Sequence, residues 1–141
     1  MPALCDVNVL LALVYQPHQH HTAALAWFDA QPRAGVAVCR MSQLALFRLL
    51  SNKTVMGPDV CTHTRVWQLW DMIAADRRFV YFQEPDGLDA QLRAYTQASV
   101  PAPNLWQDAY FAGFSRVAGL QLVTFDQGFR RFSDLQLVLL A

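Results

Sequence analysis

Short apolar runs alternate along the chain with segments in which apolar residues recur every three to four positions. An uninterrupted apolar run predicts a β-strand that is buried on both faces, and the three-to-four-residue repeat predicts an amphipathic helix. The alternation of the two therefore predicts an α/β fold, with a mostly parallel sheet and helices on both of its sides. Five strands are expected, at Pro2–Cys5, Gly35–Cys39, Phe79–Phe82, Leu120–Phe125 and Leu135–Leu140.

The helical segments lie between these strands. Helices are expected at Asn8–Tyr15, within HQHHTAALAWFDAQ, at Met41–Leu50, at Thr62–Arg77, within EPDGLDAQLRAYTQAS and at Leu105–Val117, with a short helix or turn over Asp126–Phe132. The stretches SNKTVMGPD and VPAPN are expected to be loops, because they are rich in turn-forming residues and lack a repeat. Since no linker or low-complexity tract separates the elements, residues 1–141 are expected to form a single domain.

Composition narrows the class of protein. The chain is 54% hydrophobic and only 16% charged, which excludes a disordered tail. Eleven basic residues balance eleven acidic ones, which argues against broad, non-specific coating of nucleic acid but leaves a local basic groove open. No run reaches the roughly 18 apolar residues of a membrane span, and the start lacks the basic region of a secretory signal. Cys5 and Cys39 lie in apolar strand-like runs and are expected to be buried free thiols, so we expect a cytoplasmic protein.

Three aspartates stand at positions where such a fold places its ligands. Asp6 follows the first expected strand, Asp126 follows LQLVTF, and Asp108 lies in the first turn of the helix after PAPN. Each alone has an ordinary explanation, as a helix cap for Asp6 and Asp126 and as a partner of the helix dipole for Asp108. Together they are expected to converge beyond the carboxyl ends of the parallel strands. Converging carboxylates repel each other unless a cation neutralises them, and their oxygens suit Mg²⁺ or Mn²⁺, which activates water against a phosphodiester.

The segments CDVNVLLAL, HHTAALAWF, CRMSQLALFRLLSN and WQDAYFAGFSRVAGLQLVTFDQGFRRF, in this order and at this spacing, resemble the PIN-domain ribonucleases. The likeness is greatest to the VapC-type toxins of bacterial toxin–antitoxin pairs and covers essentially the whole chain. It implies an endoribonuclease that depends on Mg²⁺ or Mn²⁺, cuts structured RNA such as tRNA or rRNA, and leaves a 5′-phosphate and a 3′-hydroxyl. It also implies a small antitoxin partner and a homodimer.

The resemblance also implies roles for individual residues. Asp6, Asp108 and Asp126 are expected to hold the metal, with Asn8 orienting Asp6 or a water and Thr124 doing the same for Asp126. The departure from the family pattern is Gln43, which stands where the family commonly has Glu. Glutamine supplies a neutral carbonyl oxygen but neither a charge nor a base, so one well-occupied metal and a weak second one are expected.

Two further explanations of Gln43 stay open: a helix-surface amide without a role, or a mark of a degenerate, inactive copy of the nuclease. Three arginines are candidates for RNA contact. Arg48 faces either a phosphate, an acid of the cluster or the core beside it, whereas Arg130 and Arg131 either guide an RNA backbone or form a solvated face. Lys53 is a weaker case of the same kind.

Two other groups of side chains have ordinary explanations. His18, His20 and His21 are expected to be a solvated helix entry rather than a zinc site, because no cysteine or acid lies at ligand spacing, and the resemblance places them away from the acids. Trp67 and Trp70 share a helix face, which indicates core packing or else a groove for a dimer partner or antitoxin.

Two rival functions use the same residues. A PIN-like module that grips RNA or a protein without cutting it needs the fold but not the chemistry. A phosphatase that uses Asp6 as a covalent nucleophile is disfavoured, because such enzymes usually have a second Asp where this chain has Asn8. They also usually have a helpful Lys downstream, and the only Lys in this chain is Lys53.

Overall fold

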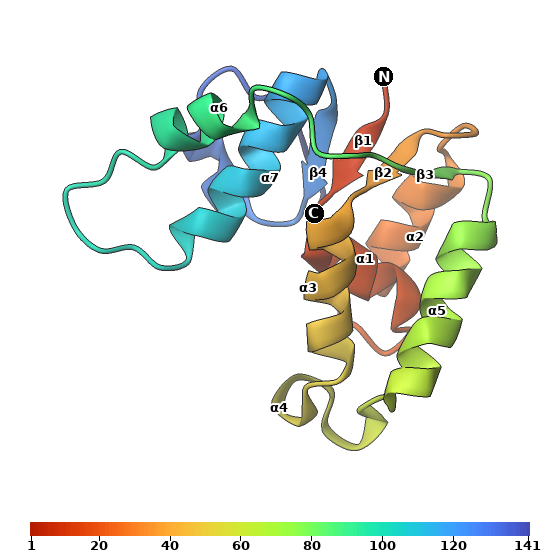
Figure 1. The fold of residues 1–141 in the computed structure, drawn as a ribbon. Coiled ribbons are helices and arrows are strands. Elements are labelled where there is room, and N and C mark those ends of the chain that lie inside the picture. Colours follow the sequence, from red (N-terminus) through yellow and green to blue (C-terminus); the bar gives the residue numbers. More distant parts are fainter.

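All five expected strands lie in one sheet in the computed structural model, which describes residues 1–141 (Figure 1). The strands are β1 (Ala3–Cys5), β2 (Val36–Val38), β3 (Phe79–Tyr81), β4 (Gln121–Thr124) and β5 (Leu137–Leu139). Their order across the sheet is β3-β2-β1-β4-β5, and every neighbouring pair is parallel. The prediction of an α/β fold with a central parallel sheet is confirmed, and β1 occupies the middle position.

Successive residues of the central strands point alternately into two separate hydrophobic cores, which explains why these strands are apolar throughout. Ala3 and Cys5 of β1 belong to one core and Leu4 to the other. In β2, Val36 and Val38 likewise lie opposite Ala37. Because side chains alternate along a strand, a sheet covered on both faces requires apolar residues at every position.

The helices divide between these two cores (Figure 1). The elements are α1 (Val7–Val14), α2 (His21–Asp29), α3 (Arg40–Leu50), α4 (Lys53–Met56), η1 (Gly57–Asp59), α5 (His63–Ala75), α6 (Leu88–Tyr95), α7 (Leu105–Ala118) and η2 (Gln127–Arg131). Helices α1, α2, α3 and α5 bury their apolar residues in the first core, whereas α6, α7 and η2 cover the opposite face. None of the helices is long and apolar enough to cross a membrane.

The stretch SNKTVMGPD is not a loop, so that prediction is wrong. It forms the short helix α4 and the 3₁₀ turn η1. The Asn52 side chain accepts hydrogen bonds from the backbone nitrogens of Thr54, at 2.9 Å, and Val55, at 3.3 Å, and Met56 is buried in the first core. A helix of one turn is too short to show a repeat in the sequence, and here a cap and one buried side chain stabilise it.

The cysteines are all free thiols, and Cys5 and Cys39 are buried, as predicted. Burial, with the nearby charge of Asp6 as a smaller contribution, raises the pKa of the Cys5 thiol. The thiol therefore stays neutral and packs as a small apolar side chain directly before Asp6.

Candidate active site

Asp6 comes directly after β1 and is the N-cap of α1. Its Oδ1 accepts a hydrogen bond from the Val7 backbone nitrogen at 2.7 Å, so the capping explanation is correct. The pairing of β1 with β4 aligns Cys5 with Val123 and thereby brings Asp6 beside Thr124. The Thr124 hydroxyl donates to Asp6 Oδ2 at 2.6 Å. Both oxygens of this buried carboxylate are therefore engaged and oriented by the chain.

Thr124 is the centre of a small polar network at the end of β4. Its buried Oγ1 also accepts from the Asp126 backbone nitrogen at 2.9 Å and from Asn8 Nδ2 at 3.3 Å, while Asn8 Oδ1 accepts from the Phe125 backbone nitrogen at 3.4 Å. The expectation for Thr124 therefore needs correction, because its hydroxyl bonds to the Asp6 carboxylate and only to the backbone of Asp126. Asn8 bonds to Thr124, not to Asp6.

Asp126 lies at the exposed N-cap of η2. Its Oδ1 accepts from the Gly128 backbone nitrogen at 2.8 Å, so the capping explanation is correct here as well. A Cβ atom at position 128 would lie 3.0 Å from Asp126 Oδ1, so a larger residue there would press on this carboxylate. The turn leaves Oδ2 of Asp126 without a hydrogen-bond partner in the chain.

Asp108 lies in the first turn of α7, as predicted, and pairs with an arginine. Arg131 Nη2 lies 2.9 Å from Asp108 Oδ2, and the two side chains are 48% and 28% exposed. The Arg131 guanidinium also lies 4.9 Å from the centre of the Phe132 ring. Arg131 is therefore not a free solvated cation, whereas its neighbour Arg130 is exposed and makes no ion pair.

The three carboxylates act on one another electrostatically. Burial raises the pKa of Asp6 to about 6, the charges of Asp108 and Asp126 add to this shift, and the hydrogen bonds from Thr124 and Val7 oppose it. Burial also raises the pKa of Asp108, where the charge of Arg131 opposes the shift and that of Asp126 adds to it. Both charged groups that act on Asp6 are acidic, so this buried carboxylate lacks a compensating cation within the chain.

The chemistry of these residues fits a hard divalent cation, although each carboxylate is engaged by the chain itself. In this arrangement no three His, Cys, Asp or Glu side chains are close enough together to hold a metal ion. In this arrangement Gly128 holds Oδ1 of Asp126, and Arg131 holds Oδ2 of Asp108. The oxygen donors and the uncompensated charge at Asp6 are the features that Mg²⁺ and Mn²⁺ require.

Gln43 is only 4% exposed, so the hypothesis of a surface amide is wrong. Its Oε1 accepts a hydrogen bond from the Arg40 guanidinium one turn earlier on α3. The Arg40 guanidinium also lies 5.7 Å from the centre of the Tyr81 ring. No hydrogen bond joins Gln43 to the three aspartates. Arg40 is not among the predicted site residues, although its spacing of three from Gln43 is a signal for contact on a helix.

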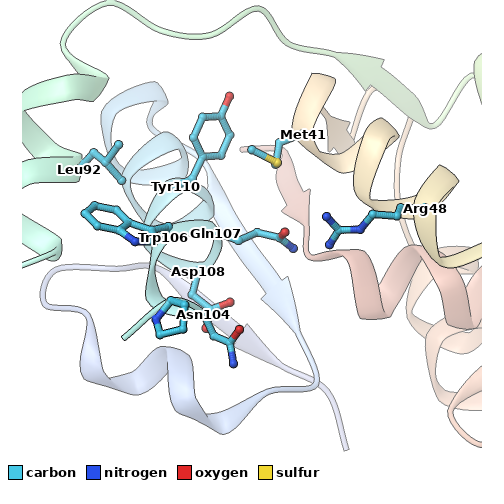
Figure 2. A pocket seen from close by; sticks show the side chains of 9 residues that line it. Met41, Arg48, Leu92, Asn104, Trp106, Gln107, Asp108 and Tyr110 are labelled. Atoms are coloured by element: carbon cyan, nitrogen blue, oxygen red, sulfur yellow. The ribbon is translucent and has the colours of Figure 1, made fainter. Parts of the chain in front are cut away.

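A cavity of about 740 Å³ opens beside Asp108 (Figure 2). Arg48 reaches it from α3 and makes no ion pair, so the alternative in which it pairs with an acid of the cluster is wrong. The other lining residues are Met41, Leu92, Pro103, Asn104, Trp106, Gln107 and Tyr110. Trp106, Gln107 and Tyr110 are not among the predicted site residues, although all three flank Asp108 in the segment WQDAY.

The histidine run lies nearer to the acid-bearing loop than predicted. The His20 ring stacks on Phe125, with the ring centres 4.4 Å apart, and Phe125 stands between Thr124 and Asp126. His20 is half-buried rather than fully solvated, and makes no hydrogen bond to an acid. The turn between α1 and α2 thus packs against the loop after β4, a contact between segments about a hundred residues apart that the local sequence does not encode.

The two helix-face tryptophans differ from each other. Trp70 packs against the first core, as predicted, whereas Trp67 is 53% exposed and contacts Phe47 edge-on, with ring centres 4.9 Å apart. Lys53, at the start of α4, is exposed and makes no ion pair.

The comparisons with known proteins agree with this arrangement. A family model described as the PIN domain matches residues 3–135. The chain belongs to the PIN-domain family. This PIN domain is 42% identical over 143 residues to Ribonuclease VapC41 of Mycobacterium tuberculosis, covering 98% of each protein, which confirms the resemblance to VapC-type ribonucleases.

Solved structures support the fold of this PIN domain. Mycobacterium tuberculosis VapC20, described as a toxin that cleaves the sarcin–ricin loop, superposes with a TM-score of 0.69 at 14% identity, covering 95% of this chain and 97% of that one. VapBC2 from Rickettsia felis, bound to a DNA fragment from its promoter, also gives a TM-score of 0.69 at 14% identity, covering 100% of both chains.

Proposed function

We propose that this PIN domain is the toxin of a type II toxin–antitoxin pair and hydrolyses RNA phosphodiester bonds with the help of Mg²⁺ or Mn²⁺. The observation that carries the proposal is the buried Asp6, which lies in the electrostatic field of Asp108 and Asp126 without a compensating cation. The 42% identity to a protein named a ribonuclease supports the same conclusion.

The chain's own residues orient the reacting groups. Thr124 and Val7 hold the two oxygens of Asp6, and Asp108 and Asp126 supply the remaining carboxylates that would hold the cation. A bound divalent cation offsets negative charge on the phosphate and makes water a stronger nucleophile near neutral pH. Gln43, held by Arg40, contributes neither charge nor base, so the three aspartates carry the site. The products carry a 5′-phosphate and a 3′-hydroxyl.

Arg131 has two roles in this proposal. Without the cation it pairs with Asp108 and partly neutralises the cluster. Asp108 would help to hold the cation in place of Arg131, whose guanidinium would then be free, beside the exposed Arg130, to contact the RNA backbone, with Arg48 on the other side of the cavity.

The partners follow from the relatives. The solved relatives include a toxin–antitoxin complex from Klebsiella pneumoniae and DNA-bound VapBC from Rickettsia felis and Salmonella typhimurium. We propose a VapB-like antitoxin, a homodimeric state, a cytoplasmic location and a structured RNA substrate such as tRNA or rRNA for this chain.

The test is the cleavage of total RNA with Mg²⁺ or Mn²⁺ by the wild type and by Asp6→Asn. The wild type is expected to cleave, and Asp6→Asn is expected to lose at least about a hundredfold in rate, because a principal anionic ligand is removed. Asp71→Asn, which neutralises an exposed carboxylate without an ion pair, is the matched control and should cleave like the wild type.

Equal cleavage by the wild type and Asp6→Asn would show that the nuclease assignment is wrong. RNA binding without any cleavage would favour the non-catalytic module, and a stable phosphate on Asp6 would favour the phosphatase.

A further inference from the structure

Trp106 lies in the first turn of α7 and is largely exposed, although the helix packs against the second core. Its side chain is 61% exposed, while Ala109 and Phe111 on the same helix are fully buried. It borders the 740 Å³ cavity beside Asp108 and also a second cavity, of about 620 Å³, under the segment 96–105. The indole therefore contributes little to the core, and its surface is available to a ligand.

The cavity that Trp106 borders combines three kinds of contact. Trp106 and Tyr110 provide aromatic surface, Asn104 and Gln107 provide amides, and Arg48 provides a cation. Figure 2 shows Trp106 and Tyr110 on the α7 side, with Gln107 extended toward the Arg48 side chain that enters from α3. Burial raises the pKa of Tyr110, so its hydroxyl is a neutral donor and acceptor.

This combination is the one that recognises unpaired nucleotides. Bases in single-stranded RNA stack on aromatic side chains, their edges hydrogen-bond to amides, and arginine contacts the phosphates. The cavity volume lies within the range of about 300–1,000 Å³ typical of small-molecule sites, which is enough for a nucleotide. The concave lining places polar groups beside aromatic rings, which suits a small ligand unit such as a nucleotide.

We propose that this cavity binds one unpaired nucleobase of the RNA, with the Trp106 indole as its stacking surface and Arg48 on its phosphate. The inference rests on the proposed function, because Asp108 lines the same cavity two residues after Trp106. A base stacked there leaves its phosphodiester beside Asp108. Trp106 thus selects which nucleotide, unpaired and splayed out of its helix, is presented to the carboxylates.

The experiment measures binding separately from cleavage. A short single-stranded oligoadenylate that carries one 2-aminopurine is titrated with the Asp6→Asn protein, in which cleavage is expected to be slowed at least about a hundredfold, and with Asp6→Asn combined with Trp106→Ala, Trp106→Phe or Trp67→Ala. We expect Trp106→Ala to weaken binding about 5- to 100-fold and to abolish the quenching of 2-aminopurine, and Trp106→Phe to restore most of both, because the ring is kept. Trp67→Ala removes a similarly exposed indole from α5 and should change neither.

Unchanged affinity and quenching in Trp106→Ala would overturn the proposal, as would an equal loss in Trp67→Ala. If Trp106→Ala alters only the oligomeric state in light scattering, the indole is a protein contact and the proposal also fails. Its failure is distinguishable from failure of the nuclease assignment, because the wild type would still cleave RNA. Conversely, if binding depends on Trp106 but the wild type does not cleave RNA, the nucleobase site is supported and the protein is non-catalytic.

Discussion

Asp6 and Asp108 belong to the same candidate site but are held by different kinds of contact. Asp6 is 5% exposed, and a backbone amide and the buried Thr124 hydroxyl fix its two oxygens at the ends of paired strands. Asp108 is held by the half-exposed guanidinium of Arg131, which lies on the short η2 turn between β4 and β5. The sheet end is therefore preorganised, whereas the rim of the cavity can exchange its partner.

The difference has an energetic basis. A hydrogen bond to a buried charged group is costly to lose, because the group has no water to replace it, whereas a half-exposed ion pair contributes about 0–1 kcal/mol. A cation or an RNA phosphate therefore displaces Arg131 from Asp108 easily but does not displace Thr124 from Asp6. The site combines one fixed carboxylate with one that responds to ligands.

The largest expected effect is the pH dependence that the burial of Asp6 produces. Its pKa is about 6 in the folded protein and 3.8 as the ordinary value, so between these values the folded state holds the proton more tightly than the unfolded state does. The contribution of protonated Asp6 to the free energy of unfolding is therefore fully present below about pH 4. It is lost as the pH rises through 6, a decrease of up to about 3 kcal/mol. The hydrogen bond from Arg78 lowers the pKa of Asp76, so the stability that Asp76 contributes is lost only at a pH below this range.

The measurement is thermal unfolding in EDTA from pH 4 to pH 8 for the wild type and Asp6→Asn. The stability of Asp6→Asn relative to that of the wild type should be higher at pH 8 than at pH 4. Asp71→Asn should follow the wild type at both. Parallel curves for the wild type and Asp6→Asn would show that Asp6 is ionised alike in both states. Because both proteins contain His18, its contribution cancels in the difference.

The next effect concerns the hydroxyl that fixes Asp6. Thr124→Val keeps the shape of the buried side chain but removes one donated and two accepted hydrogen bonds, and is expected to destabilise the protein by about 2 kcal/mol. Asp108→Asn, which breaks the half-exposed pair, is expected to cost less than about 1 kcal/mol. Urea unfolding at pH 7 measures both, and Thr124→Ser is the control that retains the hydroxyl. If Asp108→Asn costs as much as Thr124→Val, the contrast between the two acids is wrong.

The smallest effect tests the exchange at Asp108. Arg131→Gln removes the ion pair and should tighten the binding of Mn²⁺ about 2- to 5-fold, because the half-exposed pair no longer competes for the carboxylate. Arg130→Gln removes the same charge from the neighbouring residue without breaking an ion pair, and should change the affinity less. Isothermal titration calorimetry gives both affinities. Equal tightening by the two variants would mean that net charge, rather than the contact with Asp108, controls metal binding.

The strands, most helices and the three aspartates are predictable because each depends on residues close together in the chain. The first strand ends at Cys5, directly before Asp6, and the fourth ends at Thr124, two residues before Asp126. The short helix α4, the burial of Gln43 and the contact of His20 with Phe125 are not predictable in this way. Each is decided by one cap, one hydrogen bond or one ring contact that leaves no repeat in the sequence.

The sequence by itself determined which residues carry chemistry and at which strand and helix ends they lie, since an acid after an apolar run is a local feature. Only the tertiary structure decided which of these residues meet. The register of β1 against β4 brings Thr124 to Asp6 across 118 residues, and the position of η2 beside α7 brings Arg131 to Asp108. Pairing of this kind depends on strand order and helix packing, in which distant segments compete for the same neighbours, and no local pattern specifies its outcome.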